Sequence, residues 1–170
     1  MPNYRRSYQA GGTFFITLVT YKRQSFFTSP LIRSNLKQAI AAVKLELPFS
    51  IPAQVLLPDH WHLLMTLPVG DFDYSKRIGK IKALTTKLSK QDSSMAITDS
   101  IWQKRFWEHQ IRDNLDFNRH IDYIHINPVK HGLVDTPEDW PFSTYHNYKR
   151  DGLIEKNWGK ALELEGNFGE

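Results

Sequence analysis

The dipeptide Pro58-Asp59 constrains the fold of this chain more than any other feature. It lies between two segments with the pattern of β-strands, residues 50–57 and residues 61–67. Parallel strands need a crossover connection of about a dozen residues or more, which two residues cannot provide. The two segments are therefore predicted to pair as an antiparallel hairpin.

The other segments place this hairpin in the middle of a longer alternation. Strand patterns occur at residues 13–21, 50–57, 61–67 and 101–112, and helical patterns at residues 31–46, 75–90 and 114–127. Strand, helix, strand, strand, helix, strand is the order of a ferredoxin-like split βαβ sandwich. The predicted fold class is α+β with an antiparallel sheet. Residues 133–170 are expected to form an irregular tail that packs on the same domain.

Composition excludes several classes of protein. At 170 residues the chain is long enough for one domain with a proper core. It contains no cysteine, which excludes disulfides and thiolate metal sites and suits a reducing cytoplasm. No run approaches the ~20 apolar residues of a membrane span. The first residues, M-P-N-Y-R-R, lack the apolar region of a signal peptide, so export is not expected.

The net charge of +4 is unevenly distributed along the chain. Residues 151–170 hold two Lys and five Asp or Glu, whereas residues 1–150 hold 20 basic and 13 acidic side chains. A basic body with an acidic tail fits a polyanionic partner. Charge alone would fit a generic basic domain equally well.

A His-x-His pair lies on the second strand of the hairpin. Side chains alternate between the two faces of a strand, so His60 and His62 point the same way. Their Cα atoms are expected to be roughly 6.5 Å apart, and Trp61, Leu63 and Met65 pack on the opposite face. Two imidazoles at this spacing can converge on one ion, which makes them half of a metal site.

The helical segment around Tyr123 carries a second unusual pattern. Apolar residues recur at Phe117, Ile121 and Ile124, and another face carries Asp116, His120, Tyr123 and Asn127. Steps of four, three and four stack these polar side chains on one face. A polar stripe is usually a solvated face, but this one holds a carboxylate, an imidazole, a phenol and an amide. Pro128 disfavours the helical conformation at Asn127, so the helix is expected to end or kink there, with Asn127 as an alternative C-cap.

Longer motifs join these two patterns. They are Y-R-R-S-Y, G-G-T-F-F-I-T, L-P-D-H-W-H, I-W-Q-K-R-F-W-E-H-Q-I-R, H-I-D-Y-I-H-I-N-P-V-K-H-G and W-P-F-S-T-Y-H. Over most of its length the chain resembles the HUH single-tyrosine transposases, and most closely their REP-associated branch. The His-x-His pair alone is a weak signal, whereas the blocks around Trp102 and Tyr123 are highly specific.

The resemblance implies an HUH endonuclease fold for residues 1–132, with the tyrosine helix across the sheet face that carries the histidines. It implies metal-assisted cleavage of single-stranded DNA, in which Tyr123 forms a covalent 5′-phosphotyrosine bond and releases a 3′-OH. The ligands would be His60, His62 and, by its spacing from Tyr123, Asn127. His120 is a candidate auxiliary catalytic residue that could orient or deprotonate Tyr123, or merely bond locally.

Cofactor and partners follow from the same resemblance and from ligand chemistry. Two imidazole nitrogens and one amide oxygen suit Mg²⁺ or Mn²⁺ when phosphate oxygens complete an octahedron. The implied substrate is the hairpin of a repetitive extragenic palindrome with a short single-stranded guide. The protein would act as a monomer or homodimer in the bacterial cytoplasm, associated with the nucleoid.

Basic residues predict the DNA-binding surface. The helical segment 75–90 has a single-sign charge run, which is less typical of a merely solvated face than a run of mixed sign. The N-terminal segment adds a smaller cluster in which aromatic side chains beside Arg suit stacking on unpaired bases. The candidate contacts are Arg5, Arg6, Lys76, Arg77, Lys80, Lys82, Lys87, Lys104 and Arg105.

Two alternatives of other classes remain at this point. One is a non-catalytic, RRM-like binder of single-stranded nucleic acid that uses Phe14, Phe15 and the Trp102 region as stacking platforms. The other is a metal hydrolase acting on small phosphoesters. The combination of Tyr123 with both histidines disfavours the binder, and the lack of a further Asp, Glu or His cluster near His60 in the sequence disfavours a two-metal hydrolase.

Overall fold

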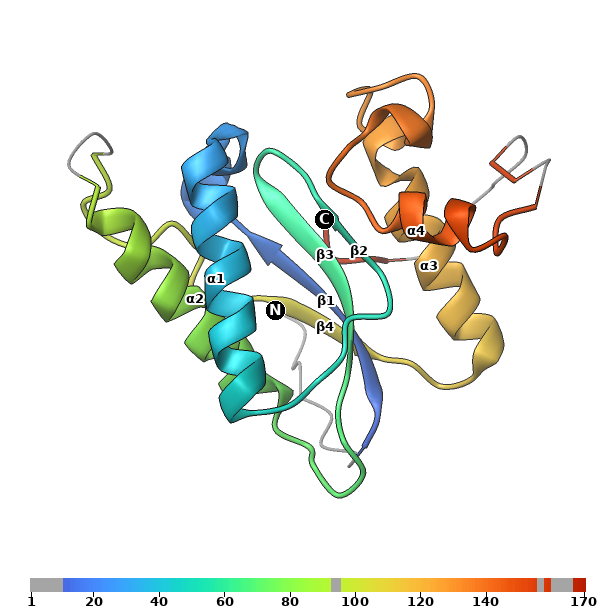
Figure 1. The fold of residues 1–170 in the computed structure, drawn as a ribbon, viewed down its shortest axis with the longest axis horizontal. Helices are drawn as coiled ribbons and strands as arrows, with labels where there is room; N and C mark the ends of the chain where they lie inside the picture. Colours follow the sequence, from blue (N-terminus) through green and yellow to red (C-terminus); the bar gives the residue numbers. More distant parts are fainter. Residues whose placement is uncertain (1–10, 93–95, 156–157, 160–166) are drawn as a thin grey trace.

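The computed structural model describes residues 11–92, 96–155, 158–159 and 167–170. Four strands form one antiparallel sheet in the order β2-β3-β1-β4 (Figure 1). The strands are β1 (Thr13–Val19), β2 (Gln54–Leu56), β3 (His60–Thr66) and β4 (Trp107–Gln110). This is the strand order of the ferredoxin-like sandwich, and β2 and β3 form the antiparallel hairpin that the short Pro58-Asp59 connection predicts.

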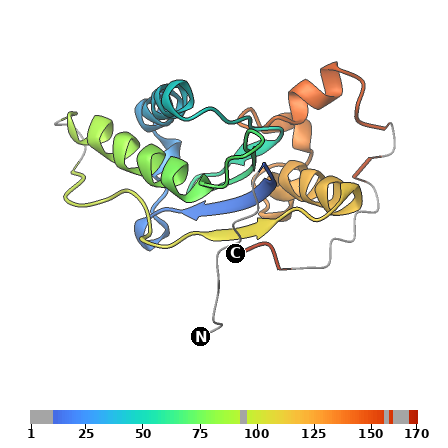
Figure 2. The same ribbon diagram turned by 90° about the horizontal axis from the view of Figure 1, so that it is seen from below.

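The helices cover the two faces of the sheet unequally. They are α1 (Pro30–Glu46), α2 (Tyr74–Lys90), α3 (Asn114–Lys130) and α4 (Tyr145–Arg150), with short 3₁₀ turns at Tyr21–Arg23, Phe26–Thr28 and Pro137–Asp139. Figures 1 and 2 show α1 and α2 together on one face and α3 on the other. Side-chain oxygens of Ser29, Asp73 and Asp113 cap the backbone N–H groups that begin the three long helices.

The alternation of side chains along β1 and β3 divides the core in two. Phe14, Trp61 and Leu63 pack with α1 and α2, whereas Phe15 and Leu64 pack with α3. The histidines therefore share the α3 face, and Trp61, Leu63 and Met65 pack on the opposite face as predicted. Phe14 and Phe15 are both 0% exposed, so neither can stack on a base as the RRM-like alternative requires.

Three predicted strands are longer than the observed ones, and the first, expected at 13–21, ends at Val19. The segment expected at 50–57 is a strand only at Gln54–Leu56, because Pro52 lacks the N–H that a continuous ladder needs. The segment expected at 101–112 is a strand only at Trp107–Gln110. Before it, Trp102 pairs with Thr20 in an isolated bridge. Gln103 N–H still donates to the Val19 carbonyl, and the chain then runs outside the sheet as far as Trp107, with Lys82 Nζ bound to the carbonyl oxygens of residues 103 and 104.

The sequence predicts that α3 ends or kinks at Asn127, but the helix does not end there. The helix continues through Pro128 to Lys130. Gly132, with φ of +66°, ends it instead: the Gly132 N–H donates to the Val129 carbonyl and the Leu133 N–H to the Pro128 carbonyl. This pair of bonds is a Schellman motif, which needs a left-handed residue after the helix. The added turn brings Lys130 to the same end of the helix as Asn127.

Residues 133–155 pack against the hairpin and α3. Ser143 pairs with Val55 in an isolated bridge, Trp140 Nε1 donates to the Leu56 carbonyl, and Tyr148 Oη donates to the Pro52 carbonyl. These contacts cover the outer edge of β2, which would otherwise expose unpaired backbone groups. The division of the chain at residue 132 stays a prediction. None of the helices in the described part of the chain is both long and apolar enough to cross a membrane.

Burial of a histidine under this cover makes folding depend on pH. His125 is 1% exposed and its Nε2 bonds Thr144 Oγ1, and burial lowers the pKa of His125 from 6.5 to about 4. The unfolded chain thus binds the proton more tightly, so stability present above pH 6.5 is lost as the pH falls toward 4. For one such site the loss reaches roughly 3 kcal/mol.

We therefore expect the metal-free protein to melt at progressively lower temperature between pH 6.5 and pH 4. His125→Gln, which can keep a bond to Thr144, should flatten that dependence relative to the parent protein. His146→Gln should flatten it less, because burial is the larger cause of the lowered pKa of His125 and the charge of His146 is the smaller one. Equal pH dependence in the parent and His125→Gln proteins would contradict the prediction.

Candidate active site

The two histidines of β3 lie side by side under α3. Their ring centroids are 4.9 Å apart, and His60 and His62 are 2% and 0% exposed. Pairing of β3 with β1 sets their positions, since His62 lies opposite Thr17 and His60 opposite Val19. The predicted convergence of two imidazoles on one side of the sheet is therefore present.

Hydrogen bonds fix the proton of each imidazole on the nitrogen that faces away from the site. The Thr17 hydroxyl donates to the Phe168 carbonyl, so its oxygen can only accept from His62 Nδ1, at 2.8 Å. His60 Nδ1 likewise donates to Asp59 Oδ1 at 2.6 Å. Each Nε2 atom then carries a lone pair that can bind a metal ion. In metal sites, a hydrogen bond from the other ring nitrogen commonly orients the histidine in this way.

The neutral form of His62 is strongly favoured. Burial lowers the pKa of His62 to about 4, and the carboxylate of Glu170 only partly offsets this effect. Nevertheless His62 Nε2 lies 3.0 Å from Glu170 Oε1. Two lone pairs at that distance repel unless a proton or a cation lies between them, so the pair itself indicates a cation-binding position.

Asn127 of α3 completes the group. It is 0% exposed, and its Nδ2 donates to Glu170 Oε1 at 2.9 Å. Within the described part of the chain, His60 Nε2 and Asn127 Oδ1 are buried and have no hydrogen-bond partner. Buried polar atoms normally have partners, and these two are donors of electron pairs. The residues present therefore fit a divalent cation held by His60, His62 and Asn127.

Tyr123 lies one helical turn before Asn127 and beside the histidines. Its ring centroid is 5.3 Å from that of His62, and the residue is 1% exposed. Burial, assisted by the Glu170 carboxylate, raises the pKa of Tyr123. Lys130 Nζ donates to Tyr123 Oη at 3.3 Å and lies 4.7 Å from the ring centroid. A cation in that position favours the phenolate.

Phe168 and Glu170, from residues 167–170, pack against Tyr123 and Asn127. The Phe168 ring stacks on the Tyr123 ring with centroids 3.8 Å apart and an interplanar angle of 8°. Glu170 also accepts hydrogen bonds from Lys130 and His131. Burial alone would raise the pKa of Glu170, but donors including His131 and Asn127 hold it well below its usual range. The carboxylate is therefore charged and occupies the position where an anionic substrate would approach.

A family model described as "Transposase IS200 like" matches residues 11–127. The chain belongs to the IS200-like transposase family. It is 45% identical over 158 residues to the REP-associated tyrosine transposase of Escherichia coli (strain K12), an alignment that covers 93% of this chain and 91% of the relative. A relative from Haemophilus influenzae (strain ATCC 51907 / DSM 11121 / KW20 / Rd) is 39% identical over 175 residues and 97% of each chain.

A solved structure agrees with these relatives. The structure of a REP-associated tyrosine transposase bound to a REP hairpin matches with a TM-score of 0.87 and 42% identity, covering 100% of this chain and 98% of the other. The family resemblance and the fold class predicted from the sequence are thus confirmed, and the chain is an enzyme of the tyrosine transposase type.

Five residues in the site of this transposase are not among the site residues predicted from the sequence. They are Asp59, Lys130, His131, Phe168 and Glu170. The sequence shows no further acidic or histidine cluster near His60, but the folded chain forms one. His60, His131 and Glu170 lie close enough to share one ion. His131 follows Asn127 by four residues, so helical spacing would have found it had Pro128 not been expected to end α3. The distant Glu170 gave no such signal.

His120 is buried but lies apart from the phenol. Its Nδ1 bonds the Asp116 carbonyl at 2.7 Å, and the ring packs against Phe15 and Phe168. Asp116 instead accepts from His109 and Arg112, donors that overcome burial and hold its pKa well below the usual range. Among the described contacts, none is a hydrogen bond from His120 to Tyr123. An auxiliary catalytic part for His120 stays a prediction.

Arg77 is not a DNA contact of this transposase, contrary to the sequence prediction. The side chain is 1% exposed. Its guanidinium donates to the Asp71 carboxylate and to the backbone carbonyls of Leu47, Pro48 and Asp73. All of these bonds would have to break before it could reach a phosphate. Arg77 therefore ties α2 to the segment that precedes it and to the segment that follows α1.

The other predicted DNA contacts differ in how freely they can move. Lys80 forms an ion pair with Glu46 of α1, and Lys82 is held by backbone carbonyls. Lys76, Lys87, Lys104 and Arg105 are exposed. Arg5 and Arg6 lie outside the described residues.

Proposed function

We propose that the chain is a metal-dependent single-strand DNA endonuclease and strand transferase that works through a covalent bond to Tyr123. One observation carries this proposal: His60, His62, Asn127 and Tyr123 meet on one side of the sheet, with His60 Nε2 and Asn127 Oδ1 buried and lacking partners in the described part of the chain. Family membership supports a tyrosine nucleophile.

His60, His62 and Asn127 would hold the cation, and Asp59 and Thr17 would orient the two imidazoles. We propose Mg²⁺ or Mn²⁺, since two neutral nitrogens and an amide oxygen leave positions for phosphate oxygens. When bound, the cation would withdraw charge from the scissile phosphate and fix it for attack. The protein contributes ligand atoms that are buried and already in place, and both imidazoles are neutral.

The reaction exchanges one phosphate ester for another. Tyr123 Oη forms a bond to phosphorus while the bond from phosphorus to the 3′ oxygen breaks. The phenol proton leaves to solvent and the 3′ oxygen takes one up. The energy of the diester is kept in the phosphotyrosine bond, so a 3′-OH can reverse the step and join strands without ATP.

Lys130 has the geometry to assist this step. The pKa of Tyr123 is raised by burial, so the phenolate needs a nearby positive charge. Lys130 Nζ already contacts Tyr123 Oη and also donates a hydrogen bond to the Glu170 carboxylate. Once Glu170 leaves, the ammonium group is free to stabilise the phenolate.

The proposed substrate is hairpin DNA. Support comes from the structural relative, which is described as bound to a REP hairpin, and from the basic body of the chain. The exposed side chains of Lys76, Lys87, Lys104 and Arg105 remain the proposed phosphate contacts, together with Lys80 and Lys82 if their present bonds can be exchanged.

A denaturing gel can test the function directly. The protein is incubated with a hairpin that carries a labelled single-stranded overhang, with Mn²⁺ or with EDTA. We expect a shorter DNA product and a labelled protein band that survives boiling in detergent, both lost with EDTA. Cleavage without any covalent band would contradict the transferase. Tight binding without cleavage in Mg²⁺ or Mn²⁺ would favour the RRM-like binder, which the burial of Phe14 and Phe15 disfavours.

Residues 167–170 should slow this reaction. Phe168 covers the ring of Tyr123, and Glu170 occupies the approach to Asn127 and Lys130. We expect Phe168→Ala combined with Glu170→Ala to raise the rate of adduct formation several-fold at saturating Mn²⁺. Phe142→Ala, which removes an exposed ring elsewhere, is the control. A slower double variant would mean that Glu170 serves the reaction instead.

A further inference from the structure

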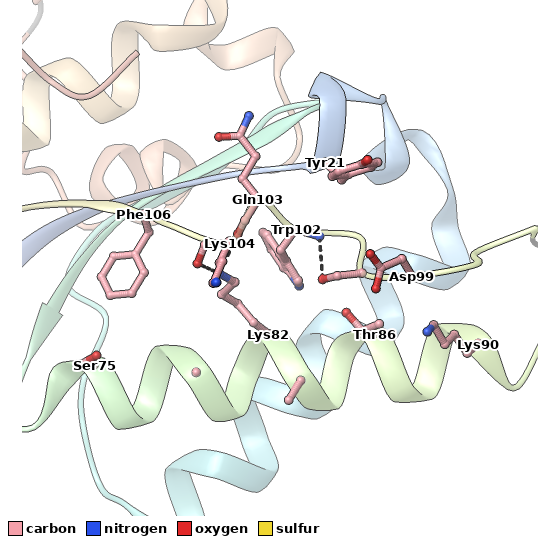
Figure 3. A pocket seen from close by; sticks show the side chains of 13 residues that line it. Tyr21, Ser75, Lys82, Thr86, Lys90, Asp99, Trp102, Gln103, Lys104 and Phe106 are labelled. Atoms are coloured by element: carbon pink, nitrogen blue, oxygen red, sulfur yellow. Dashed lines mark hydrogen bonds between the residues drawn. The ribbon is translucent and has the colours of Figure 1, made fainter. Parts of the chain in front are cut away.

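A second group of metal-binding side chains lies on the α3 face of the sheet. His109 of β4 and Asp116 and His120 of α3 each offer one ligand atom, and these atoms all lie within 4.8 Å of one another. None of the three belongs to the other such group in the described part of the chain, which is the one around His60. They also take no part in the groove on the other face of the sheet, which Figure 3 shows between α2 and the segment 99–106.

The fold brings these residues together from two elements. His109 pairs with Phe15 across the ladder of β1 and β4, so its side chain lies on the same face as that of Phe15, toward α3. Asp116 and His120 are four residues apart on α3, which places one above the other. The carboxylate of Asp116 therefore lies next to both imidazoles.

The distances within the group are close to those around a bound ion. His109 Nε2 lies 2.8 Å from Asp116 Oδ2, and His120 Nδ1 lies 3.4 Å from Asp116 Oδ1. The two imidazole rings are nearly parallel, with centroids 4.9 Å apart and an interplanar angle of 13°. A tetrahedral ion with bonds of about 2.0–2.1 Å holds its ligand atoms about 3.4 Å apart. Small rotations of the side chains are therefore enough to admit an ion.

Two of the ligands are buried in the protonation states that bind metal. Asp116 and His120 are each 5% exposed. Burial lowers the pKa of His120, so its imidazole is neutral. Burial opposes the charge of Asp116, but hydrogen bonds from Arg112 and His109 hold the pKa of its carboxyl well below the usual range. A neutral imidazole and an ionised carboxylate are the forms that a metal ligand needs.

Aromatic rings hold both imidazoles in place. The His109 ring stacks on Trp107, with centroids 6.1 Å apart and an interplanar angle of 13°. The centroid of the His120 ring lies 4.7 Å from that of Phe15 and 5.2 Å from that of Phe168. These contacts restrict the rotation of the ligands before an ion arrives, which reduces the entropy that binding has to remove.

Arg112 is the cation that lies against the carboxylate in the absence of a metal. Its backbone N–H and its Nε both donate to Asp116 Oδ2. These bonds use Oδ2, so an ion can bind at Oδ1, which is the oxygen nearer to His120. The Arg112 side chain is 70% exposed, and its guanidinium can therefore move into solvent when an ion binds.

Binding of an ion requires the proton of each imidazole to change place. The proton of His109 moves from Nε2 to Nδ1, and that of His120 moves from Nδ1 to Nε2, so both rings stay neutral. His120 Nδ1 gives up its bond to the Asp116 carbonyl. That carbonyl keeps its partner within α3, because it also accepts the backbone N–H four residues later.

We propose that His109, Asp116 and His120 bind a second divalent cation and that this ion is Zn²⁺. Two imidazoles and one carboxylate are the donor set of zinc sites that keep one position open. Mg²⁺ prefers oxygen ligands, and Mn²⁺ binds nitrogen donors less tightly than Zn²⁺. The ion would fasten β4 to the first turns of α3, the helix that carries Tyr123. This site goes beyond the proposed function and does not rest on it.

The metal content of the protein tests for the second site. Metal-free protein is dialysed against Zn²⁺ at low micromolar concentration, and the bound zinc is measured by mass spectrometry. We expect His109→Gln to hold one Zn²⁺ per chain fewer than the parent protein, with the same deficit in a His62→Ala background, where the first site is disabled. His146→Gln is the matched control, because His146 Nε2 bonds the Trp140 carbonyl outside both groups, and it should hold as much zinc as the parent.

A cysteine variant provides a spectroscopic signature. The chain contains no cysteine, so a charge-transfer band from thiolate to Co²⁺ can arise only from a cysteine that is introduced. His120→Cys places a sulfur beside Asp116 while His109 remains, and the metal–sulfur bond of about 2.3 Å partly offsets the shorter side chain. With Co²⁺ in place of Zn²⁺, we expect an intense near-ultraviolet band in His120→Cys. Asn118→Cys, at an exposed position of the same helix, should show none.

Equal zinc content in the parent and His109→Gln proteins would overturn the second site. A Co²⁺ spectrum of His120→Cys that matches that of Asn118→Cys would overturn it as well, and this measurement decides the question if His109→Gln does not fold. Neither experiment uses DNA. Loss of the covalent Tyr123 adduct in the parent protein would contradict the proposed function and leave the zinc site standing.

Discussion

Replacing Tyr123 by Phe should abolish the covalent adduct and DNA cleavage while leaving the fold intact. The change removes one oxygen, which accepts from Lys130 at 3.3 Å and also bonds the Glu170 carboxylate. The ring remains stacked on Phe168 and beside His62. We therefore expect a melting temperature within a few degrees of the parent and unchanged hairpin affinity, with both gel products at background.

Tyr148→Phe is the matched control for this experiment. Tyr148 Oη donates to the Pro52 carbonyl outside the site, so its loss should affect stability slightly and cleavage not at all. Comparable cutting by the Tyr123→Phe protein would show that a water molecule is the nucleophile. The strand-transfer part of the proposal would then fail, even though the metal site could still be correct.

Local periodicity explains why the sequence predicts much of this site. A strand repeats every two residues, so His60 and His62 had to share a face. A two-residue connection left the hairpin as the only pairing for β2 and β3. Helical spacing placed Tyr123 and Asn127 on one face of α3, which the structure bears out by burying both in the same site. These predictions depend on residues that are close in the chain.

The failures have specific physical causes. Pro128 was expected to end α3, but proline removes only one backbone donor, and the Schellman bonds around Gly132 set the actual end. The single-sign charge run predicts Arg77 on the basic face of α2, although this residue is in helical register with the buried Tyr74, Ile78 and Ile81. That register is visible in the sequence, so the burial of Arg77 could have been predicted.

Residues 167–170 could not have been placed by any such rule. Glu170 contacts His62 across 108 positions of sequence and Asn127 across 43. The sequence predicts only that residues 133–170 are an irregular tail that packs on the domain and that residues 151–170 are acidic. Long-range contacts of this kind depend on the complete fold, because the groups that lie against Glu170 come from β3 and from the end of α3.

Loss of the metal ligands should have an effect as large as loss of the nucleophile, with a second signature in stability. A ligand that binds only the folded state stabilises it by RT ln(1 + [L]/Kd), about 2.7 kcal/mol at a hundredfold excess over Kd. We therefore expect Mn²⁺ to raise the melting temperature of the parent protein by several degrees. His60→Ala and His62→Ala should abolish both that increase and cleavage.

Asn127→Ala should behave differently from the histidine variants. It removes an oxygen ligand while both imidazoles remain, so Mg²⁺-supported cleavage should fall most and high Mn²⁺ should partly restore it. Each melting temperature is compared with that of the same variant in EDTA, which separates metal binding from any destabilisation caused by cutting back a buried side chain. His146→Ala removes an imidazole that bonds the Trp140 carbonyl, outside the site, and should keep the full Mn²⁺ response. His60 Nε2 and Asn127 Oδ1 are buried without a hydrogen-bond partner among the described residues. An unchanged Mn²⁺ response in His60→Ala and Asn127→Ala would nevertheless remove both from the metal site and leave His62, His131 and Glu170 as its candidates.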